Sequence, residues 1–213
     1  MSILKRNGSQ GEYFGSSFES SETLTAEQQQ QNAKYIHSFL ISKGWKLNAI
    51  AALLGNMQAE SGLNPGRWQS DNVGNTAAGY GLVQWTPATK YIEWCNSEGY
   101  SDPSEMDSGL NRIIYEVGAG IQWISTDTYS FSFEDFTKSN SDAGELAKAF
   151  LLNYERPADQ GASVQSYRAG LALEWLAFLK NNGGSQGGGS GGVGGIRKRK
   201  KFNFILFGRR VNN

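Results

Sequence analysis

The stretch GNMQAESGLNPGRWQ, residues 55–69, joins the end of an apolar helical pattern to a dense run of turn residues. Upstream, apolar residues recur at the i, i+3, i+4, i+7 spacing of one buried helix face, which predicts a helix over residues 47–60. These apolar residues are Ile50, Leu53, Leu54 and Met57. At roughly 100° per residue, Glu60 falls at the edge of that apolar stripe. We therefore expect its side chain to be half-buried.

The turn residues after Glu60 suggest why a carboxyl group ends this helix. They are Gly62, Asn64, Pro65 and Gly66, which favour a bend away from the helix end and can leave Glu60 facing an open groove. A carboxyl group beside apolar side chains can stay protonated at neutral pH, because burial disfavours the ionised form. Cleavage of a glycosidic bond needs such an acid beside the leaving oxygen. A solvated glutamate at a helix end fits the same position, so the rest of the chain must decide.

A second motif, GYGLVQWTP at residues 79–87, adds groups suited to binding a sugar. Its glycines let a ligand approach the backbone, and its side chains offer an amide and aromatic faces. The candidate substrate-binding residues here are Tyr80, Gln84 and Trp85, with Trp68 from the preceding PGRWQ. The tryptophans fit the protein core equally well.

Periodicity and capping signals predict a mostly helical body over residues 25–181. Besides the helix at 47–60, we expect helices at 25–43, from Pro87 through Cys95, at 107–125, at 142–156 and at 163–181. The helix at 107–125 would bury Ile121 and Ile124, and the last helix would pack through Tyr167. Residues 61–86 should be irregular or hold a short hairpin. Residues 1–24 are polar and aperiodic, which predicts a flexible arm.

Several classes of protein are disfavoured by composition. The only histidine, His37, lies inside a predicted helix, and the only cysteine is Cys95, so we expect no metal site, no cofactor and no internal disulfide. No apolar run approaches the roughly 18 residues of a transmembrane helix, and the first residues lack the apolar core of a secretory signal. Carboxylates are the remaining catalytic candidates.

Charge is divided unevenly along the chain. Residues 196–213 contain seven of the 20 basic residues and no acidic one, which leaves 13 basic against 20 acidic residues elsewhere, a net charge of −7. The body is therefore not expected to bind nucleic acid. Residues 182–195 read as a Gly-rich linker, and the basic, apolar segment 196–213 as a docking tail for another protein or for an anionic membrane surface.

The motifs ESGLNP, GYGLVQWTP and FLLNYERPAD together resemble the lysozyme-like domain of phage tail proteins, over roughly residues 30–180. The resemblance is closest to tail-knob lysozymes of small short-tailed phages that infect Gram-positive bacteria. More distantly, Glu60-Ser61 and the sequence from Gly81 to Gln84 look like signatures of goose-type lysozymes and lytic transglycosylases. The resemblance implies a mainly α, lysozyme-like fold in a protein of the virion tail. It also implies cleavage of peptidoglycan glycan strands of the host wall, and contacts with other tail proteins.

The same resemblance implies roles for individual residues. Glu60 matches the catalytic acid, Gln84 matches a glutamine that lines the groove, and Tyr154 lies where related enzymes place a tyrosine near the acid. No motif identifies a second carboxylate: Asp71 is the nearest candidate in sequence, and Glu155 is the second. If Glu155 does not have that role, we expect it to bind substrate or to pair with Arg156 at the helix end. Tail-knob proteins can continue into a metal-dependent peptidase domain, but with one histidine we expect no zinc peptidase here.

Several alternatives remain open from the sequence. The enzyme would be either a hydrolase or a lytic transglycosylase, which attacks through the sugar itself and manages with one glutamate. A catalytically silent glycan-binding tail protein would present the same groove. An endolysin released at the end of infection would also fit the lysozyme motifs.

Overall fold

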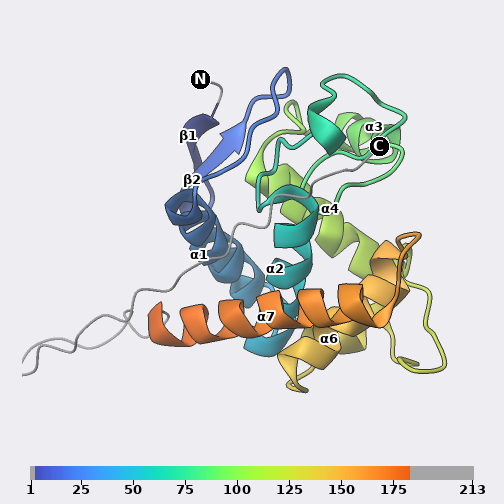
Figure 1. Cartoon of the computed structure of the whole chain (residues 1–213). Helices are drawn as coiled ribbons and strands as arrows, with labels where there is room; N and C mark the ends of the chain where they lie inside the picture. Colours follow the sequence, from blue (N-terminus) through green and yellow to red (C-terminus); the bar gives the residue numbers. More distant parts are fainter. Residues whose placement is uncertain (1–2, 183–213) are drawn as a thin grey trace, which may run out of the picture.

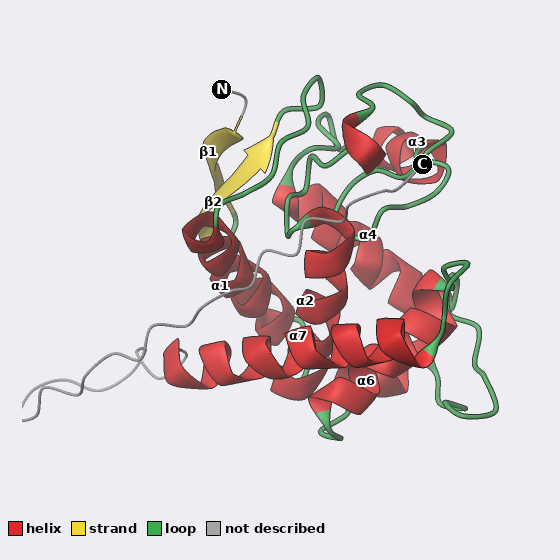
Figure 2. Cartoon of the chain, in the orientation of Figure 1, coloured by secondary structure: helices red, strands yellow, loops and turns green. Residues whose placement is uncertain are grey.

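The central helix of the protein is α2 (Leu47–Ser61), which packs against α1, α5, α6 and α7. The computed structural model describes residues 3–182, and Figures 1 and 2 show the arrangement of the elements. Every residue of α2 from Ala49 to Met57 is buried, so the helix is enclosed on all sides rather than on one face. Its exposed end carries Glu60, whose side chain is 22% exposed, as expected.

Helix α1 (Ala26–Ser42) begins and ends where the sequence predicts. The Thr25 side chain accepts a hydrogen bond from the Gln28 backbone N–H, and the Gln28 side chain accepts one from the Thr25 N–H. This reciprocal capping box satisfies two backbone donors of the first turn. Tyr35, Ile36, Phe39 and Leu40 face the core.

The prediction that residues 1–24 form a flexible arm is wrong for residues 3–24. Strands β1 (Ile3–Gly8) and β2 (Gly11–Ser16) form an antiparallel hairpin, paired from Ile3 with Ser16 to Gly8 with Gly11. Figure 2 shows this hairpin beside the start of α1. Tyr13 and Leu24 are buried, and the Asn32 side chain of α1 bonds both backbone groups of Phe14. Few apolar residues mark these strands, so their pattern alone did not reveal them.

The segment between α2 and α3 (Thr89–Ser97) is irregular, as predicted. It contains one short turn of 3-10 helix, η1 (Gln69–Asp71), and two isolated bridges that pair Tyr80 with Trp68 and with Trp85. It holds no regular hairpin. Helix α3 begins after Pro87 rather than at it, with Tyr91 and Cys95 in the core as the pattern predicts.

Helix α4 (Met106–Ala119) is shorter than the predicted helix at 107–125. Gly120 takes a left-handed conformation (φ 63°) and ends the helix, a common use of glycine at this position. Ile121 and Ile124 therefore lie outside the helix and are exposed, Ile124 to 61%. A short helix that the sequence pattern did not predict, α5 (Phe133–Lys138), follows with a Ser132–Asp135 capping box.

Helix α6 (Ala143–Phe150) is capped by Asp142 and continues into a π-helical turn, η2 (Leu151–Glu155), that ends at Arg156, as predicted. Helix α7 (Ala162–Asn182) lies across α2 and α6 (Figure 1). Tyr167 on α7 is 49% exposed, so its predicted packing into the core is wrong.

The fold is mainly α with one small sheet, as the sequence predicts. Among the described residues, none of the helices has the length and apolar character needed to cross a membrane. The predicted linker and docking tail lie outside the described residues, apart from Asn182, the last residue of α7.

Candidate active site

A groove of about 840 Å³ opens beside the exposed end of α2. Its walls come from the segments around residues 67–70 and 83–86, from η2 and from the first turns of α7. Six of the eight predicted site residues line it: Glu60, Trp68, Gln84, Trp85, Tyr154 and Glu155. The lining residues that the sequence analysis missed include Lys90, Gln122, Tyr167 and Arg168. His37 and Cys95 do not line the groove.

The two central motifs meet at the end of α2. The Ser61 hydroxyl donates to the backbone oxygen of Leu82 (2.8 Å), in the GLVQ turn, and it also contacts the backbone oxygen of Met57 (3.1 Å). Gly62 ends the helix in a left-handed conformation (φ 63°). The serine that follows Glu60 therefore fixes the GLVQ turn beside the helix end, which places Glu60 and Gln84 in the same groove.

Arg168 is the cation on which the two groove carboxyl groups converge. Its guanidinium pairs with Glu60 through Nη2, lies 3.7 Å from Oε2 of Glu155, and donates through Nη1 to the backbone oxygen of Asn56 (2.8 Å). The Arg168 side chain is 8% exposed. Burial lowers the pKa of Arg168, but Glu155 and Glu60 outweigh that effect and raise it.

Close contact between α2 and α7 brings Arg168 to Glu60. Gly55 lies against the backbone of Arg168 and Ala172, and a Cβ at position 55 would come within 2.7 Å of the Ala172 nitrogen. Glycine in a helix interior costs roughly 0.5–1 kcal/mol relative to alanine. Here it allows the two helix backbones to approach.

Glu155 has the most perturbed environment of the carboxyl groups in the groove. Its side chain is 5% exposed, and its Oε1 has no hydrogen-bond partner within residues 3–182. Burial raises the pKa of Glu155 well above its ordinary value, and the charge of Glu60 raises it further, against the opposing effect of Arg168. Glu155 therefore keeps its proton to a higher pH than an ordinary glutamate side chain does.

Gln84 is held by its amide nitrogen, which donates to the backbone oxygens of Arg67 (3.0 Å) and Gly81 (2.9 Å). Its backbone is in a left-handed conformation (φ 53°), which is uncommon outside glycine. Its Oε1 has no protein partner in the part of the chain that the structure describes. The fixed amide thus leaves one acceptor for a ligand.

Residues 31–179 match the phage tail lysozyme family. The chain belongs to that family. It is also similar to morphogenesis protein 1 of Bacillus phage B103, with 46% identity over 160 residues. The aligned region is 75% of this chain but only 42% of the relative, so the chain spans less than half of that longer protein.

The tyrosine that the family resemblance places near the acid has a different partner here. Tyr154 lines the groove, but its hydroxyl donates to the carboxylate of Glu116 rather than to Glu60. Glu116 also accepts hydrogen bonds from Trp85 Nε1 (3.0 Å) and Arg112 Nε (2.8 Å). Burial raises the pKa of Glu116, although these donors oppose the shift. Two predicted groove residues are thus fixed by a buried carboxyl group that the sequence analysis missed.

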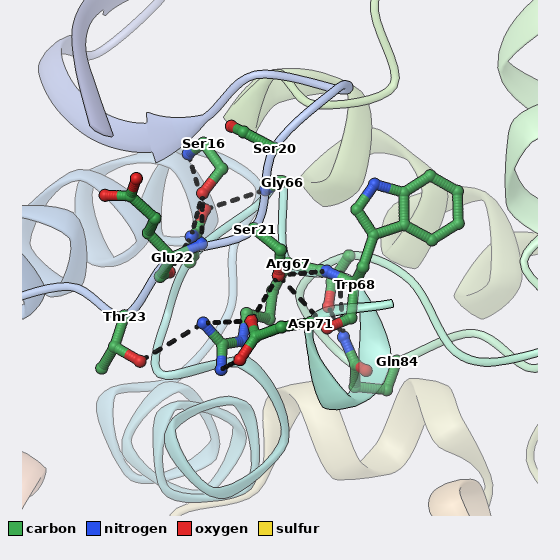
Figure 3. A network of polar contacts seen from close by, with 12 residues as sticks. Ser16, Ser20, Ser21, Glu22, Thr23, Gly66, Arg67, Trp68, Asp71 and Gln84 are labelled. Carbon is green, nitrogen blue, oxygen red and sulfur yellow. Dashed lines mark hydrogen bonds and ion pairs between the residues drawn. The ribbon is translucent and has the colours of Figure 1, made fainter. Parts of the chain in front are cut away.

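Asp71 is not brought to Glu60. Figure 3 shows its carboxylate held by Arg67 (3.0 Å) and by the Ser21 hydroxyl (2.8 Å). Its side chain is 56% exposed and does not line the groove. The prediction that Asp71 is the second catalytic carboxylate is therefore not supported by the geometry. Arg67 lies four positions before Asp71 in the sequence, so the exposed Asp71 carboxylate pairs with it instead.

The predicted sugar-stacking aromatics belong to the core. Tyr80 is fully buried and does not line the groove, so its prediction as a binding residue is wrong. Trp68 and Trp85 touch the groove, but both are buried and donate their indole N–H groups to protein acceptors. Tyr167 also lines the groove, and this aromatic residue is 49% exposed. Glu155 also makes no ion pair with Arg156, whose guanidinium bonds the backbone oxygens of Gln122 and Asn153.

Proposed function

We propose that this protein cleaves the glycan strand of peptidoglycan in the host cell wall, with Glu60 as the general acid. The observation that carries this proposal is the position of Glu60, partly exposed at the mouth of a polar groove and paired with a buried arginine. Membership of the phage tail lysozyme family supports the substrate class. In the proposed reaction, protonated Glu60 gives its proton to the glycosidic oxygen as the bond to the sugar breaks.

The second half of the reaction has two candidate forms. In a muramidase, water adds to the sugar cation; in a lytic transglycosylase, a hydroxyl of the sugar closes onto it instead. The second form is favoured by the distribution of carboxyl groups, because Glu60 and Glu155, the two that line the groove among the described residues, both lie on Arg168. Because the two forms give different products, the test identifies which of them occurs.

The test is mass spectrometry of purified Gram-positive peptidoglycan after digestion by the full chain. Three proteins are compared: the native protein, Glu60→Gln, and Glu174→Gln, a matched change at an exposed glutamate of α7. We expect soluble muropeptides from the native protein and from Glu174→Gln, and none from Glu60→Gln. Reducing ends identify a muramidase, and anhydro ends a transglycosylase. If the native protein binds peptidoglycan but releases nothing, it is a glycan-binding tail protein and the proposal fails.

We further propose that the protein acts as a part of the phage tail, docked through residues 196–213. The basic, apolar composition of that segment supports this role. Deletion of residues 183–213 should remove the protein from purified particles while the isolated variant still digests peptidoglycan. Native protein that is absent from particles and present only in the lysate would instead indicate an endolysin. Flotation with anionic liposomes tests the membrane alternative.

A further inference from the structure

The buried carboxyl group of Glu155 has no role in the proposed reaction of Glu60 alone. One of its oxygens has no hydrogen-bond partner within residues 3–182, and the other lies 3.7 Å from Arg168 Nη2. A buried, ionised carboxylate needs donors at both oxygens, and leaving one without a donor costs on the order of 1–3 kcal/mol or more. A protonated carboxyl group needs fewer donors. The surroundings of Glu155 therefore suit its acid form.

The charges around Glu155 lead to the same conclusion. Helix α7 contributes one cation, Arg168, and α2 contributes one carboxyl group, Glu60. The other titratable groups nearby are the phenols of Tyr154, on the same turn as Glu155, and Tyr167, on α7. Two ionised carboxylates on one arginine would leave a net negative charge in a partly buried site. Two carboxyl groups so placed are expected to share one proton.

This arrangement addresses a difficulty in the proposed chemistry. The proposed role requires Glu60 to donate a proton while it is paired with Arg168, so the site needs a source for that proton. A second carboxyl group beside Glu60 can be this source if it transfers its own proton to Glu60. Glu155 is placed to do so, since its carboxyl group and that of Glu60 approach the same Nη2 atom of Arg168.

We propose that Glu155 stores the proton that Glu60 delivers to the glycosidic oxygen, with Arg168 holding the two carboxyl groups together. The inference rests on the proposed function of Glu60 and extends it. The proton of the Glu155 carboxyl group passes to the Glu60 carboxylate, which leaves Glu155 ionised beside Arg168. Protonated Glu60 then protonates the leaving oxygen as the glycosidic bond breaks, and its O–H electron pair stays on Glu60. After the reaction both carboxylates are ionised on Arg168, and one proton from water or from the attacking hydroxyl restores the pair. Glu155 is thus a positioning residue that acts through Glu60.

The experiment compares the pH dependence of muropeptide release by the native protein, Glu155→Gln and Glu174→Gln. Glutamine keeps the shape of the side chain but has no carboxyl proton to supply. We expect the alkaline limb of the profile to move to lower pH by at least about one unit in Glu155→Gln, so that the ratio of native to variant rates grows about tenfold from the acid side to pH 7. Glu174→Gln should keep the native profile. A Glu155→Gln profile that is lowered uniformly, or not at all, overturns the proposal.

A second readout does not depend on activity. Infrared spectra of the native protein at pH 7 should contain the C=O stretching band of a protonated carboxyl group that is lost in Glu155→Gln. Because Glu116 is also buried, the decisive sign is that this band shifts in Glu60→Gln, whose amide replaces the carboxylate partner. If Glu155→Gln does not fold, the shift in Glu60→Gln still decides. A native protein that is inactive but shows the band refutes the proposed function and keeps the shared proton; an active protein without it refutes the proton store alone.

Discussion

Tyr154 and Glu155 are neighbours in the chain, yet their side chains belong to two different clusters. The Tyr154 hydroxyl donates to Glu116, whereas the Glu155 carboxyl group lies beside Arg168 and Glu60. Both residues lie in the π-helical turn η2, in which each turn of backbone takes in an extra residue. Such turns are frequent at functional sites. Here one turn places both Tyr154 and Glu155 in the lining of the groove, although their side chains have different partners.

The first prediction separates these clusters. Tyr154→Phe removes one hydrogen bond to Glu116, which keeps its contacts with Arg112 and Trp85, so we expect a loss of about 1–3 kcal/mol in the free energy of unfolding. Since the hydroxyl does not contact Glu60, the alkaline limb of the pH profile should not move. Urea denaturation and the rate profile measure the two effects. A limb that moves as in Glu155→Gln would show that the hydroxyl acts on the acid.

The second prediction concerns the buried ion pair between Arg112 and Glu116, which accepts a hydrogen bond from Trp85. Arg112→Met leaves the buried Glu116 without its cation, and removing one partner of a buried pair typically costs about 3–5 kcal/mol. The matched control is Lys148→Met, which breaks a partly exposed ion pair with Glu145 and should cost less than about 1 kcal/mol. Chemical denaturation of both variants gives the comparison. Equal losses would mean that Glu116 is stabilised by its neutral partners alone.

The third prediction follows from the raised pKa of Glu155. A carboxyl group whose pKa is higher in the folded state binds its proton more tightly there, so its stabilising contribution is complete below the unfolded value of 4.5 and is lost as the pH rises through the folded pKa. Glu155→Gln removes this titration. The variant should therefore gain stability relative to the native protein as the pH rises above about 4.5. Urea denaturation across that range measures the difference, and a constant difference would place Glu155 at an ordinary pKa.

Much of the fold and part of the site follow from local sequence patterns. The limits of α1, α2 and α6 follow from capping residues and apolar spacing, and Glu60 and Gln84 follow from their motifs. Arg168 was missed because its partners are 108 and 13 positions away in sequence, and nothing local distinguishes it from a solvated arginine. Asp71 was chosen for its closeness to Glu60 in sequence, but Arg67 and Ser21 hold it outside the groove.

The hairpin was missed for a related reason, since side chains distant in sequence hold it to the body, and one of them is the buried Asn32. Asn32 accepts from the Phe14 N–H (2.8 Å) and donates to the backbone oxygens of Phe14 (2.7 Å) and Leu63 (2.9 Å). These contacts join β2, α1 and the turn after α2. An asparagine within a helical pattern gives no sign of such a role until the chain is folded.

The fourth prediction tests this anchor. Asn32→Ala leaves up to three buried or partly buried backbone groups without partners, which should lower the free energy of unfolding by roughly 2–5 kcal/mol. Amide hydrogen exchange in β1 and β2 should increase more than exchange in α2. The control is Gln31→Ala, which removes one exposed bond to the backbone oxygen of Glu12. If both variants exchange alike, the hairpin is held by its other contacts, such as those of Ser16 with Asn64 and of Arg6 with Asp102.

The last prediction concerns the helix crossing that builds the acid pair. Gly55→Ala places a Cβ 2.7 Å from the backbone nitrogen of Ala172 and 3.0 Å from the backbone oxygen of Arg168, so α2 and α7 must separate. Overpacking of this kind costs about 1–3 kcal/mol, and the separation should also weaken the contact between Arg168 and Glu60 and lower the rate of muropeptide release. Gly170→Ala is the matched control, because a Cβ there meets no atom within 4 Å and should stabilise α7 by about 0.5–1 kcal/mol. Unfolding curves and rates are measured for both variants. A Gly55→Ala protein that is as stable and as active as Gly170→Ala would show that the crossing tolerates a wider spacing and that Glu60 does not depend on it.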